Sequence, residues 1–213
     1  MDNTRRLRLT LVLFGALAGG MAWAQHSAAP VLVAAIDPHP TQEHTSGTDA
    51  IQRSVSLVNV PPVKMVRADG AHVSLDKELG DGRPVVMNFV FTSCTTICPL
   101  GSQELSRLQD RLGSDAGAVH LVSISIDPEQ DTPARLRAYA KHFDAGSAWQ
   151  YYTGTSEASA RVQKSFGVYR GDKMSHAPVT LIYSGSGDSW VKLDGFATVD
   201  VLYSELKSLR AIP

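Results

Sequence analysis

Two almost uninterrupted apolar runs constrain the fold more than any other feature of this chain. Residues 84–91 read PVVMNFVF, and residues 118–126 read AVHLVSISI. Strands that are apolar along their whole length are buried on both faces, as parallel strands covered by helices are. Between the runs, Pro99 suits the first turn of a helix that ends at Gly113. Its predicted apolar face consists of Leu100, Leu105, Leu108 and Leu112. The pattern predicts a β-α-β unit.

The flanking segments extend this unit into a complete α/β domain. Asp69-Gly70 is a hairpin-turn signal between two short extended segments that begin near Leu57. After the second apolar run, Thr132 and Pro133 cap a helix. The remaining predicted elements are a strand near 149–152, a helix over 156–166, paired strands around the 185–188 turn and a last helix from Thr198. This order predicts a thioredoxin-like α/β fold, with a central mixed sheet flanked by helices and an N-terminal β-hairpin.

The N-terminal residues have the pattern of a signal peptide. Arg5, Arg6 and Arg8 precede an apolar stretch, and Ala22-Trp23-Ala24 presents small residues for cleavage. We expect residues 1–24 to direct export to the periplasm, with an uncleaved membrane anchor as the less favoured alternative. The predicted division is a signal peptide over 1–24, a flexible arm over 25–54 and the thioredoxin-like domain over 55–213.

The charge of the chain argues against a nucleic-acid partner. The net charge is -1, and 19% of the 213 residues are charged. Nucleic-acid binding requires a basic excess or clustered Lys and Arg on one face, and the sequence has neither.

Cys94 and Cys98, the two cysteines of the chain, lie in the motif FTSCTTICP. A disulfide persists in an exported protein, but one between these residues closes a very short loop and stabilises little. The motif precedes a helix N-terminus, which favours thiolate over thiol. Thiolates four residues apart suit either a redox pair or a soft metal ion, Cu(I) above all, or Zn. The motif alone leaves both chemistries open.

His176 is the strongest candidate for a third ligand. It lies just before the apolar strand PVTLIY, and in a thioredoxin-like domain that loop faces the cysteine loop. Imidazole is a good copper ligand. The other histidines have plainer explanations as turn, strand, helix-end or arm residues: His72, His120, His142, His26, His39 and His44.

Asp127 and Pro178 are weaker candidates. Asp127 opens the motif DPEQDTP, most of which is explained by a loop and a helix cap, but its carboxylate is also placed to orient a ligand or carry a proton. Pro178 occupies the place where thioredoxin-like oxidoreductases have a cis-proline, although an ordinary loop proline is the more frequent case.

Taken together, these motifs resemble the Sco (SenC) family of copper chaperones for cytochrome c oxidase assembly. The resemblance covers about Val63 to Leu209 and rests on VVMNFVFTSCTTICP, VSISIDPEQDTP, Thr153-Gly154 and the lone histidine before a strand. It implies that Cys94, Cys98 and His176 bind copper, as Cu(I) or Cu(II). It also implies that the chain helps to load the binuclear copper site of oxidase subunit II, or reduces the cysteines of that site. The chain departs from the family at Thr95-Thr96, where many members have Pro-Asp.

The predicted function is therefore that of a periplasmic copper chaperone. Its expected partners are cytochrome c oxidase subunit II or another cuproprotein, and other periplasmic copper carriers. The alternative is a thiol-disulfide reductase in which Cys94 attacks a partner disulfide and Cys98 resolves the mixed intermediate. A copper sensor stays open, whereas a peroxidase is disfavoured because Thr92 is only two residues before Cys94.

Overall fold

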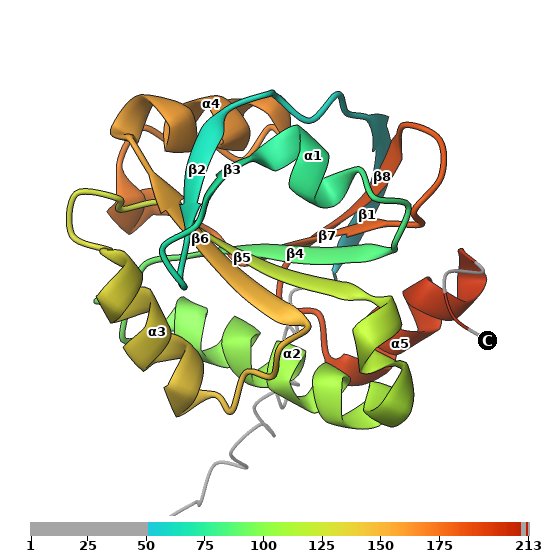
Figure 1. Ribbon diagram of the computed structural model, residues 1–213. Helices are drawn as coiled ribbons and strands as arrows, with labels where there is room; N and C mark the ends of the chain where they lie inside the picture. Colours follow the sequence, from blue (N-terminus) through green and yellow to red (C-terminus); the bar gives the residue numbers. More distant parts are fainter. Residues whose placement is uncertain (1–50, 210–211, 213) are drawn as a thin grey trace, which may run out of the picture. The chain divides into compact units, whose positions relative to one another are not determined.

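The computed structural model describes residues 51–209 and residue 212. Within this part of the chain, one eight-stranded mixed sheet has the order β1-β8-β7-β4-β5-β6-β2-β3 (Figure 1). The strands are β1 (Gln52–Leu57), β2 (Lys64–Arg67), β3 (His72–Ser74), β4 (Val85–Val90), β5 (His120–Ser125), β6 (Trp149–Gly154), β7 (Val179–Tyr183) and β8 (Ser189–Asp194).

Helices cover both faces of the sheet (Figure 1). They are α1 (Leu75–Leu79), α2 (Ile97–Leu112), α3 (Pro133–His142), α4 (Ser156–Ser165) and α5 (Val199–Ser208), with 3-10 turns η1 (Gly113–Ala118) and η2 (Lys173–Ser175). Residues of α1 and α4 pack in one buried cluster, and residues of α2, α3 and α5 pack in another on the opposite face. The predicted mixed sheet flanked by helices is confirmed.

The two apolar runs form adjacent parallel strands, β4 and β5, inside the sheet. Every residue of both strands is buried. Val85, Met87 and Phe89 belong to the cluster with α1 and α4, whereas Val86 belongs to the cluster on the other face. Full burial of each such side chain stabilises the fold by about 1.5–3 kcal/mol. The near-continuous apolar pattern follows from this two-sided burial.

The face of α2 differs from the prediction at one position. Leu105, Leu108 and Leu112 are buried, but Leu100 is 50% exposed. At 3.6 residues per turn, Leu100 lies about 140° around the helix from Leu105. The fully buried residue of the first two turns is Ser102, whose hydroxyl lies 3.0 Å from the Tyr139 hydroxyl.

The N-terminal hairpin is present as β2 and β3, which pair antiparallel. Gly70 supplies the positive φ of its turn, +96°. A further strand, β1, precedes the hairpin and pairs antiparallel with β8 at the other edge of the sheet. Because β1 begins at Gln52, the last residues assigned to the arm over 25–54 belong to the sheet. The rest of that arm and the predicted signal peptide lie outside the described residues.

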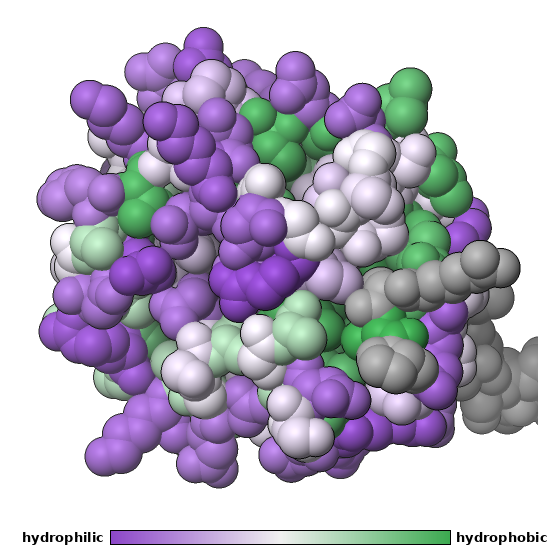
Figure 2. Space-filling view, turned by 45° about the vertical axis from the view of Figure 1, so that its right-hand side comes forward, coloured by the Kyte–Doolittle hydropathy of each residue, from purple (hydrophilic) through white to green (hydrophobic). Residues whose placement is uncertain are grey.

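The exposed large apolar residues of the described part of the chain include Val55, Leu57 and Leu100. Figure 2 shows a largely hydrophilic face with isolated apolar patches. The edge strand β1 contributes to the exposed apolar surface through Val55 and Leu57. None of the described helices has the length and apolar character needed to cross a membrane.

Candidate metal centre

The cysteine loop connects the carboxyl end of β4 to the first turn of α2. The backbone N–H of Cys94 donates to the carbonyl of Phe91 (3.0 Å), which turns the chain directly after the strand. The backbone N–H of Cys98 then donates to the sulfur of Cys94 (3.4 Å). Both cysteines are free thiols and are buried. The N-cap residue of α2, Thr96, makes no side-chain cap bond, so the Cys94 sulfur serves as an acceptor at this helix end.

The two thiols differ in acidity because their surroundings differ. Burial works to raise the pKa of Cys94, but the amide donors of Cys98 and Thr96 outweigh it, and the pKa of Cys94 is lowered. Burial raises the pKa of Cys98 far above its ordinary value, and the neighbouring Cys94 and Asp131 add to this effect. Cys94 is therefore the thiol that ionises first.

Asp131 fastens the loop to the sheet. Its fully buried carboxylate accepts hydrogen bonds from the Thr92 hydroxyl (2.6 Å), the Thr92 N–H (3.2 Å) and the Ser125 hydroxyl (2.6 Å). Thr92 follows β4 and Ser125 ends β5, so one side chain ties both strand ends together two residues before Cys94. The sequence pattern did not single out Asp131; the signal available was the second aspartate of DPEQDTP, directly before the helix cap.

His176 approaches the cysteine loop because β7 runs antiparallel to β4. The amino end of β7 therefore meets the carboxyl end of β4, and His176 follows the turn η2 just before β7. Its Nε2 lies 3.1 Å from the carbonyl oxygen of Phe89. Since a carbonyl oxygen can only accept, Nε2 carries the proton and Nδ1 is the nitrogen with a free lone pair.

The imidazole of His176 is held neutral. Burial lowers its pKa, Arg170 lowers it further, and the bond to Phe89 only partly opposes this. A histidine that binds a metal through one nitrogen commonly donates its other N–H to a backbone carbonyl. The tautomer of His176 thus fits a metal ligand.

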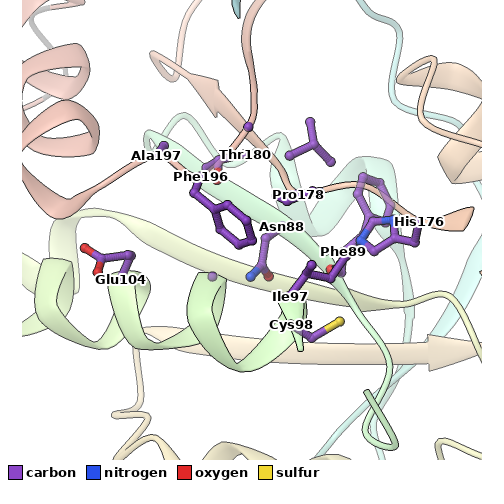
Figure 3. A pocket seen from close by; sticks show the side chains of 13 residues that line it. Asn88, Phe89, Ile97, Cys98, Glu104, His176, Pro178, Thr180, Phe196 and Ala197 are labelled. Carbon is purple, nitrogen blue, oxygen red and sulfur yellow. Dashed lines mark hydrogen bonds between the residues drawn. The ribbon is translucent and has the colours of Figure 1, made fainter. Parts of the chain in front are cut away.

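Two cavities bring the predicted site residues together. Cys94 and His176 line a cavity of about 280 Å³, and Cys98 and His176 line a smaller one of about 30 Å³. Figure 3 shows the smaller cavity, with His176 beside Phe89 and Cys98 at the start of α2. In the part of the chain that the structure describes, no three His, Cys, Asp or Glu side chains are grouped closely enough to hold a metal ion. A three-ligand site therefore requires a local closure of His176 onto the cysteines.

Asp127 anchors the turn that precedes His176. Its carboxylate accepts a hydrogen bond of 2.5 Å from the ammonium group of Lys173. The bond to Asp127 raises the pKa of Lys173. Asp127 is thus joined to the site through Lys173. The bond to Lys173 holds η2, and the part of Asp127 in orienting a ligand or carrying a proton stays a prediction.

The other residues considered from the sequence lie apart from the cysteine loop or act structurally. His120 starts β5, and its Nε2 lies 2.8 Å from a carboxylate oxygen of Asp81. His72 is exposed on β3, and the ring of His142 packs against Phe143. The arm histidines His26, His39 and His44 lie outside the described residues. Pro178 lines the smaller cavity, and its carbonyl accepts from Gly195.

A mixed sheet flanked by helices, with Cys98 in the first turn of α2, Cys94 in the loop before it and His176 just before β7, is the arrangement of a thioredoxin-like protein. The sequence profile of the SCO1/SenC family matches residues 59–210. The chain belongs to the SCO1/SenC family.

Individual relatives agree with this assignment. The SCO1 protein homolog of Bacillus subtilis is 33% identical over 100 residues, which cover 46% of this chain and 51% of the relative. The copper-bound ScoI of Arabidopsis thaliana is 29% identical with a TM-score of 0.60, over 74% of this chain and all of that one (100%). BsSco is a Sco-family cytochrome c oxidase assembly protein studied for a disulfide switch. It is 27% identical with a TM-score of 0.63, and the match covers 75% of this chain and 98% of BsSco. The chain spans about half or less of the length of the curated relatives it matches.

Proposed function

We propose that this chain is an exported copper chaperone that holds copper through Cys94, Cys98 and His176. The observation that carries the proposal is the tautomer of His176, whose Nε2 is bonded to Phe89 and whose Nδ1 is free at cavities shared with both cysteines. Copper-bound ScoI of Arabidopsis thaliana supports the choice of metal. Export to the periplasm is part of the proposal and is supported by the signal-peptide pattern of residues 1–24.

The ligand chemistry supports copper as cargo. Thiolates are soft ligands that favour Cu(I), and imidazole accepts both copper oxidation states. The pKa of Cys94 is lowered and that of Cys98 is raised by burial, so Cys98 is the thiol whose proton a bound cation would displace. Binding therefore releases a proton from Cys98, and the affinity rises with pH. The closure of His176 onto the cysteines completes the site.

Delivery takes place by ligand exchange with a protein that offers its own copper ligands. The proposed recipient is cytochrome c oxidase subunit II or another cuproprotein, in keeping with the oxidase-assembly role of BsSco. Other periplasmic copper carriers are the proposed source of the ion.

Metal analysis of the reduced protein tests the proposal. We expect one tightly held copper per chain, with thiolate-to-Cu(II) absorption in the oxidised-metal form. Cys94→Ser, Cys98→Ser and His176→Ala each lose the metal or change the spectrum, whereas His72→Ala, on the exposed strand β3, serves as the matched control. Unchanged copper binding in the two cysteine variants would refute the proposal.

A thiol-disulfide reductase is the second candidate, favoured by the opposite pKa shifts of the two thiols. The Cys94 thiolate attacks a partner disulfide and releases one partner thiolate. The sulfur of Cys98, after losing its proton, attacks the Cys94 sulfur and releases the second partner thiolate. The products are a Cys94–Cys98 disulfide and a reduced partner, a two-electron exchange.

His176→Ala separates the two functions. A copper chaperone loses affinity in this variant, whereas a reductase keeps its rate of disulfide reduction. The measurement is the rate at which the reduced protein cleaves the disulfide of an oxidised peptide, made beside copper titration. A wild type that binds no copper tightly but reduces the peptide would establish the second candidate.

A further inference from the structure

Met174 is an exposed thioether beside the candidate copper site. Its side chain is 74% exposed, whereas Met65 and Met87 are fully buried in the core. It lies two residues before His176 and lines the same cavity of about 280 Å³ as Cys94 and His176. The cavity therefore presents three soft or borderline copper ligands: a thiolate, a thioether and an imidazole.

The backbone that carries Met174 is held in place on both sides. The Asp172 carboxylate accepts a hydrogen bond from the Met174 N–H (2.9 Å), and the carbonyl of Asp172 accepts from Ser175 (3.1 Å). Lys173 is tied to Asp127. The side chain thus projects from an anchored turn at the cavity, rather than from a free loop.

The chemistry of a thioether suits the exchange of cuprous copper. The sulfur of methionine is neutral, carries no proton and favours Cu(I) over harder ions. Binding to it requires no deprotonation, and Met174 is far easier to reach than Cys98, which is only 3% exposed. A copper ion can be taken first by Cys94 and Met174, and then by the less accessible Cys98.

We propose that Met174 is a further copper ligand, which binds Cu(I) together with Cys94 both in the loaded site and as the ion enters and leaves it. The inference rests on the proposed copper-carrying function. A copper–sulfur bond to Met174 forms as a bond to the donor's ligand breaks, the ion stays Cu(I), and no proton or electron is exchanged at the thioether. On release, the order is reversed.

The chain allows a direct spectroscopic test. The full-length protein is labelled with selenomethionine, reduced and loaded anaerobically with Cu(I), and X-ray absorption is recorded at the selenium and copper edges. We expect a direct copper–selenium contact. Met174→Leu keeps the size and apolar character of the side chain while Met1, Met21, Met65 and Met87 still carry selenium, so loss of the contact in this variant assigns it to Met174. The absence of any copper–selenium contact in the wild type, with copper held by both cysteines, overturns the role of Met174.

Transfer kinetics give the second readout. Cu(I) release to bathocuproine disulfonate is followed for the wild type, Met174→Leu and the matched control Leu100→Ala, another exposed apolar residue. We expect Met174→Leu to slow transfer and to lower Cu(I) affinity about tenfold, the size typical of a lost supporting group at a metal site. Wild-type kinetics in Met174→Leu would indicate that the residue is only an apolar contact surface and would overturn the inference.

Failure of this inference can be told apart from failure of the copper function. If the wild type binds no Cu(I) through Cys94 and Cys98, both proposals fall. If it binds Cu(I) through both cysteines and Met174→Leu behaves as wild type in both experiments, only the role of Met174 is rejected.

Discussion

The two ends of the central strands β4 and β5 carry histidines in opposite circumstances. At the amino end of β5, His120 is hydrogen-bonded to Asp81, which also pairs with Arg83. At the carboxyl end of β4, His176 is hydrogen-bonded to a backbone carbonyl and lines cavities shared with each thiol, with Arg170 adding positive charge nearby. At the amino end of β5 the charged side chains pair with one another. At the carboxyl end of β4 a neutral imidazole and two cysteines line open cavities.

The difference shows how the hydrogen-bond partner of a histidine decides whether its ring has a structural role or is available to bind a metal. The carboxylate of Asp81 is hydrogen-bonded to Nε2 of His120 and ties the ring to the loop before β4. A carbonyl partner fixes the tautomer of His176 but leaves its other nitrogen free for a metal. Burial alone would not have identified the candidate ligand, because His120 is more buried than His176.

Removal of Asp131 gives the largest expected effect on the stability of the cysteine end. Asp131→Ala leaves the buried donors of Thr92 and Ser125 without their charged acceptor, and we expect the free energy of unfolding to fall by about 3 kcal/mol. Urea denaturation measures the loss. Asp127→Ala is the matched control, because its partner Lys173 is partly exposed, and its effect stays below about 1 kcal/mol. Equal losses would show that the two acids anchor the loop alike.

Glutamine substitutions at the two histidines sharpen the contrast directly. His176→Gln keeps a donor for Phe89 but removes the metal-binding nitrogen, so copper affinity falls about 10- to 100-fold with little change in stability. His120→Gln lowers stability by about 1 kcal/mol through a weaker bond to Asp81 and leaves copper affinity unchanged. Copper titration and urea denaturation are run on both variants. The reverse pattern would break the comparison.

The two ends also differ in the pH range over which they affect stability. Burial lowers the pKa of His176 below 6.5, so the unfolded chain binds the extra proton and stability is lost as pH falls below about 6.5. Burial opposes ionisation of Asp81, but Arg83 and His120 outweigh it and lower its pKa, so its contribution persists above 3.8 and is lost in stronger acid.

Unfolding free energies of the metal-free protein across pH check this separation. His176→Gln removes the slope just below pH 6.5, and Asp81→Asn removes part of the slope below pH 3.8. The change in Asp81→Asn is expected to stay below about 1 kcal/mol, because Asp81 is partly exposed and its ion pairs are screened by solvent. A slope near pH 6.5 that survives His176→Gln would assign it to another group.

The smallest expected effect concerns the pair that fastens η2. Lys173→Gln removes the ion pair with Asp127, and because solvent screens this exposed ammonium group we expect the stability to change less than in any other variant. The difference from wild type should shrink in high salt, which screens such pairs. A loss of several kcal/mol would mean that the turn before His176 is as firmly built as the end that holds Asp131.

The elements best predicted from sequence are those whose pattern records burial. The continuous apolar runs of β4 and β5 and the caps at Thr132 follow from local chemistry, and the structure confirms them. The strand β1 reads QRSVSL and all its residues are exposed, so its existence depends on pairing with β8. No local signal marks such an edge strand.

Some residues of the candidate site could likewise be predicted from the sequence, and others could not. Cys94 and Cys98 are neighbours on one loop, and their closeness can be predicted from spacing. The approach of His176 depends on the antiparallel pairing of β7 with β4, which the expected fold supplied. The choice between Asp127 and Asp131 could not be predicted, because one motif contains both acids and only three-dimensional packing determines which is fully buried.

The antiparallel placement of β7 also sets the order in which the site assembles during folding. The cysteine pair belongs to one short loop, whose closure costs little chain entropy, whereas His176 joins only when a distant strand docks beside β4. In a folding chain the two thiols therefore come together before the imidazole joins them. Until β7 docks, the cysteines face oxidants without His176 beside them, so slow docking of β7 would favour a Cys94–Cys98 disulfide over the reduced pair.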